Sequence, residues 1–213
     1  MRKKTFYGTE FNQLPLYQPQ PGHAEKASQG FNYAMLQRCQ ALLNQALSKS
    51  QRILAVEITL TYPMSIDTSC LGNECVSDFI TRYCRVLREK RGFSVDFFQT
   101  SEWAPQTGRL HHHVIFLIGG DWWHFVDYRT VRELWQQALA RCLGWFDTAN
   151  EAPVHISNNW NGDGAASYGF SVEASRPEQV AELFRRMSYL AKNYSKDFGS
   201  TNMRSFTSSE LLL

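Results

Sequence analysis

Three consecutive histidines, His111–His113, begin the part of the chain with the most evident chemistry. They lead directly into residues 114–118, an apolar run rich in β-branched side chains that predicts a β-strand. Successive side chains of a strand point to opposite faces, so His111 and His113 share one face while His112 points away from them. Two imidazoles in this arrangement, with Cα atoms roughly 7 Å apart, can bind one metal ion.

A carboxylate is expected beside these imidazoles. Residues 94–103 form a second predicted strand, joined to the first by a turn that contains proline and glycine. An antiparallel hairpin centred between residues 106 and 107 places Glu102 opposite His111 on the same face. Two histidines and a glutamate suit a divalent cation such as Mg²⁺, Mn²⁺ or Zn²⁺. The alternative is a histidine run with only a structural or surface role.

A candidate nucleophile lies on a predicted helix that runs from Ser175 to about Tyr194 or Lys196. The apolar residues gather on one side of this helix, at about 100° per residue, and Tyr194 falls among them as a packing residue. Tyr189 lies on the opposite side. Its neighbours on the helix are basic: Arg185, Lys192 and Lys196. Positive charges favour the phenolate and attract phosphate, as a nucleophilic tyrosine requires, although such a side chain could also be simply exposed.

The remaining periodic segments predict the framework that positions these groups. Helices are expected over residues 24–48, 74–91 and 130–143, and further strands over 52–62, 153–157 and 168–173. A hairpin among irregularly alternating elements favours an α+β fold, with a central antiparallel sheet flanked by helices. On the first of these strands, Glu57 is either a reserve metal ligand or a structural carboxylate. Residues 1–23, basic and then rich in proline, favour an extended N-terminal arm.

The composition sets broad limits on function. A chain of 213 residues with 43% hydrophobic residues can form one well-packed domain, expected here over residues 24–213. The net charge of +2 leaves DNA binding to local patches, and the aromatic segment at Trp122 and Trp123 is a candidate for base stacking or for core packing. Five cysteines without a CxxC pair, and no signal peptide, favour a reducing cytoplasm. No run approaches the roughly 18 apolar residues that a membrane span needs.

The combination of Glu102, His111–His113 and Tyr189-Leu190-Ala191-Lys192 resembles the HUH endonuclease superfamily, and it looks closest to the inoviral and prophage rolling-circle replication-initiator-like family. The resemblance covers roughly residues 50 to 210 and includes the tail from Asn202 to Phe206. It implies a nuclease domain in which Glu102, His111 and His113 hold one divalent ion, Mg²⁺ or Mn²⁺. It also implies that Tyr189 is the nucleophile and Lys192 its helper.

Two departures from the superfamily pattern are visible. His112 stands where the superfamily usually has a hydrophobic residue. The two-tyrosine subclass has its second tyrosine four residues after the first, whereas this chain has Asn193 there and Tyr194 one position later. A single-tyrosine enzyme is therefore implied.

The expected function is metal-dependent, site-specific nicking and joining of single-stranded DNA through a 5′-phosphotyrosine, which initiates rolling-circle-type replication of a phage or mobile element. The expected DNA contacts are Arg109, Arg185, Lys196, Trp122 and Trp123. The expected partners are a replication origin in a bacterial cytoplasm, a polymerase and a separate helicase, because no G-x-x-x-x-G-K-[ST] string occurs. The alternatives are a relaxase or transposase with the same chemistry, a hydrolase without a covalent intermediate, and a non-catalytic DNA-binding replication-control module.

Overall fold

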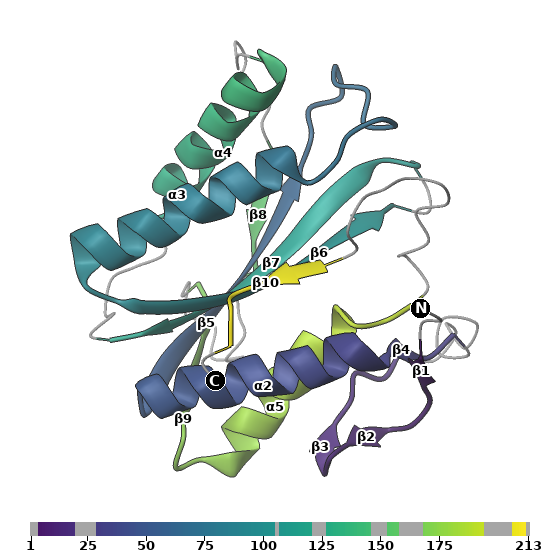
Figure 1. Ribbon diagram of the computed structural model, residues 1–213, viewed down its shortest axis with the longest axis vertical. Helices are drawn as coiled ribbons and strands as arrows, with labels where there is room; N and C mark the ends of the chain where they lie inside the picture. The colour runs from purple at the N-terminus through teal and green to yellow at the C-terminus, as the bar shows by residue number, and fades with distance from the viewer. Residues whose placement is uncertain are drawn as a thin grey trace.

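The computed structural model describes residues 4–19, 29–104, 107–120, 127–145, 153–157, 168–193 and 206–211. Its centre is one twisted antiparallel sheet (Figure 1) with the strand order β10-β6-β7-β5-β8, and β9 pairs with β5 as well. The strands are β5 (Arg52–Thr61), β6 (Ser94–Trp103), β7 (Leu110–Gly119), β8 (Val154–Ile156), β9 (Phe170–Glu173) and β10 (Phe206–Ser208). The predicted α+β fold with a central antiparallel sheet is confirmed.

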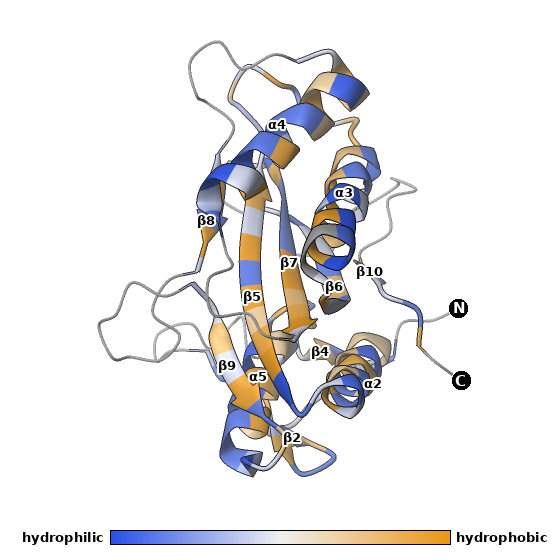
Figure 2. Ribbon diagram, turned by 90° about the vertical axis from the view of Figure 1, so that its left-hand side faces the viewer, coloured by the Kyte–Doolittle hydropathy of each residue, from blue (hydrophilic) through white to orange (hydrophobic). Residues whose placement is uncertain are grey.

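Two pairs of helices cover the two faces of this sheet. Helices α3 (Glu74–Arg91) and α4 (Tyr128–Leu143) lie on one face, while α2 (Tyr33–Lys49) and α5 (Pro177–Tyr189) lie on the other (Figure 1). Figure 2 shows β5 and β7 running between these layers, with apolar residues along much of their length. Both faces must therefore be apolar, and each strand divides its side chains between two cores.

The alternation along β5 shows this division. Leu54, Val56 and Ile58 pack in the core beneath α3 and α4, whereas Ile53 and Ala55 pack in the core against α2 and α5. Towards the end of the strand the second face turns polar, because Glu57 and Thr59 follow in the same alternation. The polar end of that face is where the candidate site lies.

The helix starts differ from those predicted because side chains upstream provide the caps. Helix α2 begins at Tyr33, after Asn32 accepts a hydrogen bond from the Met35 backbone N–H at 3.2 Å, and not at residue 24. Helix α4 is capped by Asp127 in place of the predicted Thr130. The capping box predicted at Ser175 is also wrong, because Arg176 precedes α5 without a side-chain cap.

Helix α5 ends at Tyr189, earlier than the predicted Tyr194 or Lys196. Three short-range backbone bonds follow, in which Leu190, Ala191 and Lys192 each donate to a carbonyl three residues earlier. The turn is tied to the strand β4 (Phe31–Asn32), since Asn32 donates to the Ala191 carbonyl at 2.7 Å. Tyr194 and Lys196 lie outside the described residues.

The N-terminal segment is packed, so the prediction of an extended arm is wrong for residues 4–19. Strand β1 (Thr5–Phe6) pairs with β4, and β2 (Glu10–Phe11) forms a hairpin with β3 (Leu14–Pro15). Phe11 and Leu16 are 3% and 1% exposed in the core against α2 and α5. The segment therefore covers α5 near its C-terminal end.

Strand β10 was not predicted. It pairs with the outer edge of β6, where Phe206 lies opposite Thr100. Within the part of the chain that the structure describes, no helix has the length and apolar character needed to cross a membrane.

Candidate metal and tyrosine site

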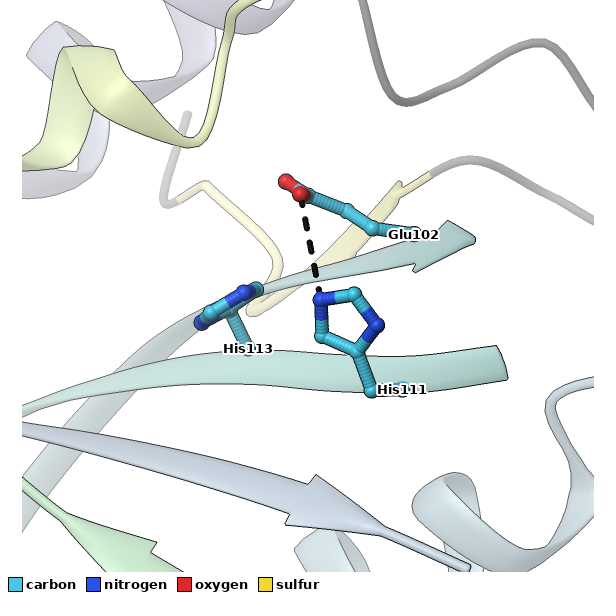
Figure 3. A group of neighbouring side chains, drawn as sticks. All are labelled: Glu102, His111 and His113. Carbon is cyan, nitrogen blue, oxygen red and sulfur yellow. Dashed lines mark ion pairs between the residues drawn. The ribbon is translucent and has the colours of Figure 1, made fainter. Parts of the chain in front are cut away.

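The hairpin of β6 and β7 brings the expected metal ligands together. Its register sets Glu102 opposite His111 and Thr100 opposite His113, as the turn position predicted. Ligand atoms of Glu102, His111 and His113 all lie within 4.8 Å of one another. Figure 3 shows the three side chains on the same side of the sheet, with His111 Nε2 4.0 Å from the Glu102 carboxylate.

This donor set fits a divalent cation. Two imidazole nitrogens and one carboxylate are common ligands for Mg²⁺, Mn²⁺ and Zn²⁺, and they leave positions open for substrate oxygens. Burial, together with the charge of His113, lowers the pKa of His111 to about 4. His111 is therefore neutral at pH 7, so its nitrogen can bind a cation without first losing a proton.

The neighbouring strand β5 orients His113 from behind. Thr59 lies opposite His113 in the β5–β7 pairing, and its hydroxyl is 3.2 Å from His113 Nδ1. Glu57 Oε1 lies 3.6 Å from the same nitrogen. Burial alone would raise the pKa of Glu57, but the hydrogen bond and charge of His113 hold it below the usual value. Contacts at Nδ1 leave Nε2 as the metal-facing nitrogen, so Glu57 supports a ligand and is not itself within the cluster.

His112 is a core residue on the opposite face. It is fully buried, with Nε2 3.0 Å from the Tyr62 hydroxyl and Nδ1 2.9 Å from the Ser101 hydroxyl. Burial, reinforced by the charges of His111 and His113, lowers its pKa to about 3. The middle histidine therefore contributes to packing and hydrogen bonding beneath α3 and α4.

Tyr189 lies beside this cluster at the last position of α5. Its ring centroid is 6.2 Å from that of His113, and the Tyr17 ring packs edge-to-face against it at 4.9 Å. The ring is partly buried against the core of α2 and α5. The helix pattern predicted only cationic neighbours for Tyr189, whereas the fold adds apolar contacts from other parts of the chain.

Lys192 joins the tyrosine to the candidate ligands. Its ammonium nitrogen lies 3.1 Å from Glu102 Oε2 and 3.2 Å from the centroid of the Tyr189 ring. Both side chains of the ion pair are almost fully buried, at 4% and 3% exposure. A cation over an aromatic face and against a carboxylate fixes the relative positions of these three groups.

The expected DNA contacts have a different outcome. Arg109 donates from Nη2 to the carbonyls of Tyr62, Pro63 and Ile66 at 3.3, 2.6 and 3.1 Å, so it holds the loop that follows β5. Arg185 forms two hydrogen bonds with the Glu182 carboxylate, at 2.7 and 2.8 Å. Trp122, Trp123 and Lys196 lie outside the described residues.

Two contacts of the site were missed in the sequence. Thr59 could have been found, because it shares the face of Glu57 on a correctly predicted strand. Tyr17 gave no such signal, because it meets Tyr189 only through folding of the N-terminal segment.

Comparison with known families assigns this arrangement. Residues 55–198, more than half of the chain, match the family model of the replication-associated protein ORF2. The chain belongs to this family. The matched range of this replication-associated protein contains all three candidate ligands, Tyr189 and Lys192. The match confirms the resemblance to HUH-type replication initiators.

The other two comparisons add little. No curated protein matches this replication-associated protein. Among solved structures, it is similar to the N-terminal nuclease domain of non-structural protein 1 from minute virus of mice, described with Zn²⁺ coordination in its active-site pocket and DNA recognition at the origin of replication. The two share 14% identity over 67% of this chain and 79% of that chain, with a TM-score of 0.37. A likeness this weak assigns no role to any residue.

Proposed function

We propose that this replication-associated protein initiates rolling-circle-type replication by nicking and joining single-stranded DNA through Tyr189. The observation that carries the proposal is the contact chain from the tyrosine to the ligand cluster. Lys192 touches both the Tyr189 ring and Glu102, and the Tyr189 ring lies 6.2 Å from that of His113. A nucleophile, a cation and a metal-binding triad therefore converge on one point of the sheet.

Glu102, His111 and His113 would hold the divalent ion, Mg²⁺ or Mn²⁺. Bound there, the ion neutralises the non-bridging oxygens of a phosphodiester and makes its phosphorus more electrophilic. Thr59 and Glu57 keep the His113 ring in its ligating orientation.

The Tyr189 oxygen would attack the phosphorus, and the bond from phosphorus to the 3′ oxygen would break. Tyr189 gives up its phenolic proton, and the departing 3′ oxygen takes up a proton to become a free hydroxyl. The DNA 5′ phosphate remains on the tyrosine. Attack on this phosphotyrosine by a 3′ hydroxyl reverses the step and joins the strands.

Lys192 would stabilise the negative charge that appears during this transfer. Its ammonium group is fixed over the ring that becomes a phenolate and close to where the phosphate must lie. Burial strengthens such an interaction, because the charge is shielded from water.

The product also defines the partners. A free 3′ hydroxyl can prime a polymerase at a replication origin, and a separate helicase would unwind the duplex. These steps suit a phage or mobile element in a bacterial cytoplasm.

The test is incubation of the protein with labelled single-stranded oligonucleotides and Mn²⁺, followed by denaturing electrophoresis. Wild type should cut and form a covalent adduct, and Tyr189→Phe should do neither while keeping its fold. Tyr33→Phe, which changes another partly buried tyrosine of the same core, should behave as wild type. Peptide mass spectrometry should find the nucleotide on Tyr189.

The competing functions give different results. Cleavage without an adduct, or cleavage that survives in Tyr189→Phe, would indicate a hydrolase that activates water. An adduct on Tyr194 would move the nucleophile to the other tyrosine. DNA binding without cleavage under any metal would indicate a non-catalytic module.

A further inference from the structure

A cavity of about 810 Å³ opens next to the candidate ligands at the end of the sheet. Its walls include Thr61 at the end of β5, His111 on β7 and Tyr128 at the start of α4. Ligand pockets in proteins occupy roughly 300–1,000 Å³, so the volume suits a small planar group and its surroundings. Because His111 belongs to both the cavity and the ligand cluster, the two sites are continuous.

The cavity gathers exposed apolar surface. Among the described residues, three large hydrophobic side chains are exposed, and two of them, Met64 at 80% and Tyr128 at 39%, line this one cavity. Tyr7 is the third, at 68%. Exposed apolar groups that converge in a concave site are typical of a binding surface.

The walls are held in place before any ligand arrives. Arg109 fastens the loop that carries Met64 through its three carbonyl bonds. The Tyr128 hydroxyl donates to the Val154 carbonyl at 3.2 Å, which anchors the tyrosine ring to β8. A preformed site loses little conformational entropy on binding.

The charge of the lining indicates an anionic ligand. Arg109 and Arg132 contribute guanidinium groups, and the described lining residues include neither Asp nor Glu. An aromatic face, a thioether and two arginines together suit a flat heteroaromatic ring attached to a phosphate backbone.

We propose that this cavity receives one unpaired nucleobase of the single-stranded DNA, stacked on Tyr128 and beside Met64. The proposal rests on the proposed function for the path of the strand. Since His111 forms part of the wall, the captured base belongs to a nucleotide within about two positions of the phosphate that is cut. The cavity thereby fixes which phosphate reaches Tyr189, and it adds a specificity element that acts through stacking.

The experiment uses the full chain carrying Tyr189→Phe, so that the DNA is bound and not cut. A set of oligonucleotides carries 2-aminopurine, or an abasic site, at each position in turn around the phosphate that wild type cuts. At one position next to that phosphate, 2-aminopurine fluorescence should be quenched on binding, and the abasic site should weaken binding by about tenfold.

Variants of the cavity identify the stacking partner. Added Tyr128→Ala should remove both the quenching and the abasic penalty at that position, while Tyr128→Phe should retain them. Met64→Ala should reduce the penalty, so the result does not depend on one variant. Tyr7→Ala, which removes an exposed tyrosine outside the cavity lining, should change nothing.

The outcomes separate this inference from the proposed function. An abasic penalty that is the same with and without Tyr128, or a sensitive position far from the cut, overturns the base-binding cavity even if wild type forms the phosphotyrosine. If wild type forms no adduct, the same scan is run on the oligonucleotide it binds most tightly. A Tyr128-dependent position would then support the cavity, and its absence would overturn it.

Discussion

The ammonium nitrogen of Lys192 lies 3.1 Å from the Glu102 carboxylate, and both side chains are buried on the face of the sheet that carries the histidines. Glu102 is also the only carboxylate of the candidate ligand cluster among the described residues. A cation that binds there must therefore share Glu102 with Lys192 or displace it. The protein has an internal positive charge that competes with the metal for the same oxygen atoms.

Lys192→Met should therefore bind Mn²⁺ more tightly in the absence of DNA, by roughly tenfold, because a charge-assisted hydrogen bond contributes about 1.5–3 kcal/mol. Isothermal titration calorimetry or the loss of free Mn²⁺ signal in electron paramagnetic resonance would measure it. Cleavage by the variant should be slower, since the phenolate loses its neighbouring cation.

Lys49→Met is the matched control for this prediction. Lys49 pairs with the buried carboxylate of Asp96 at 2.9 Å, on β6 but away from the histidines. Its loss should leave Mn²⁺ affinity unchanged. Equal or weaker Mn²⁺ binding by Lys192→Met would mean that the lysine does not compete with the metal.

Removal of a ligand should abolish metal-dependent cleavage. His111→Ala, His113→Ala and Glu102→Ala should each lose Mn²⁺- or Mg²⁺-dependent nicking, because two donors cannot hold a divalent ion against water. Circular dichroism should show that the fold is retained. Direct Mn²⁺ titration should show weakened binding in all three.

His112→Leu tests the face assignment. The imidazole bonds to Tyr62 and Ser101 in the opposite core, so leucine should leave Mn²⁺ affinity intact. Stability to urea should fall by about 1–3 kcal/mol, because two buried hydroxyl groups lose a partner. If His112→Leu abolished metal binding in a folded protein while His111→Ala did not, the ligands would lie on the wrong face.

Glu57→Gln should weaken Mn²⁺ binding by about ten- to a hundredfold, although Glu57 lies outside the cluster. The carboxylate lies at Nδ1 of His113 and increases the basicity of its other nitrogen, and supporting groups of this kind typically have effects of that size. Calorimetry on Glu57→Gln and Glu173→Gln, a carboxylate on β9, would separate this local effect from a change in overall charge. Equal losses in both variants would contradict it.

The stability of the metal-free protein should rise with pH between about 3 and 6.5. Burial holds His112 neutral in the folded state with a pKa of about 3, and His111 with a pKa of about 4, whereas an unfolded histidine protonates near pH 6.5. In this range the unfolded chain binds more protons, so acid favours unfolding and stability is lost as the pH falls.

Urea unfolding with a chelator at several pH values between about 3.5 and 7 would measure this slope. His112→Leu removes one of the two titrating groups, so its stability should depend less steeply on pH. A slope unchanged by the substitution would show that His112 does not contribute.

The sequence by itself determined the ligand set. Alternation along one strand separates His111 and His113 from His112, and a short hairpin fixes the register that sets Glu102 opposite His111. These relationships are local, since they depend on strand geometry and on a turn of a few residues. The fold class followed from the same periodicity in longer segments.

Only the tertiary structure decided what surrounds Tyr189. Helix periodicity predicted a continuous helix through Lys192, but backbone bonds to residues 30–32 accompany a turn directly after Tyr189. The turn brings Lys192 over the tyrosine ring and onto Glu102, while Tyr17 arrives from the other end of the chain. These contacts join segments separated by tens to more than a hundred residues. Local propensity contains no term for such pairings, because their free energy exists only once the sheet and both helix layers have formed.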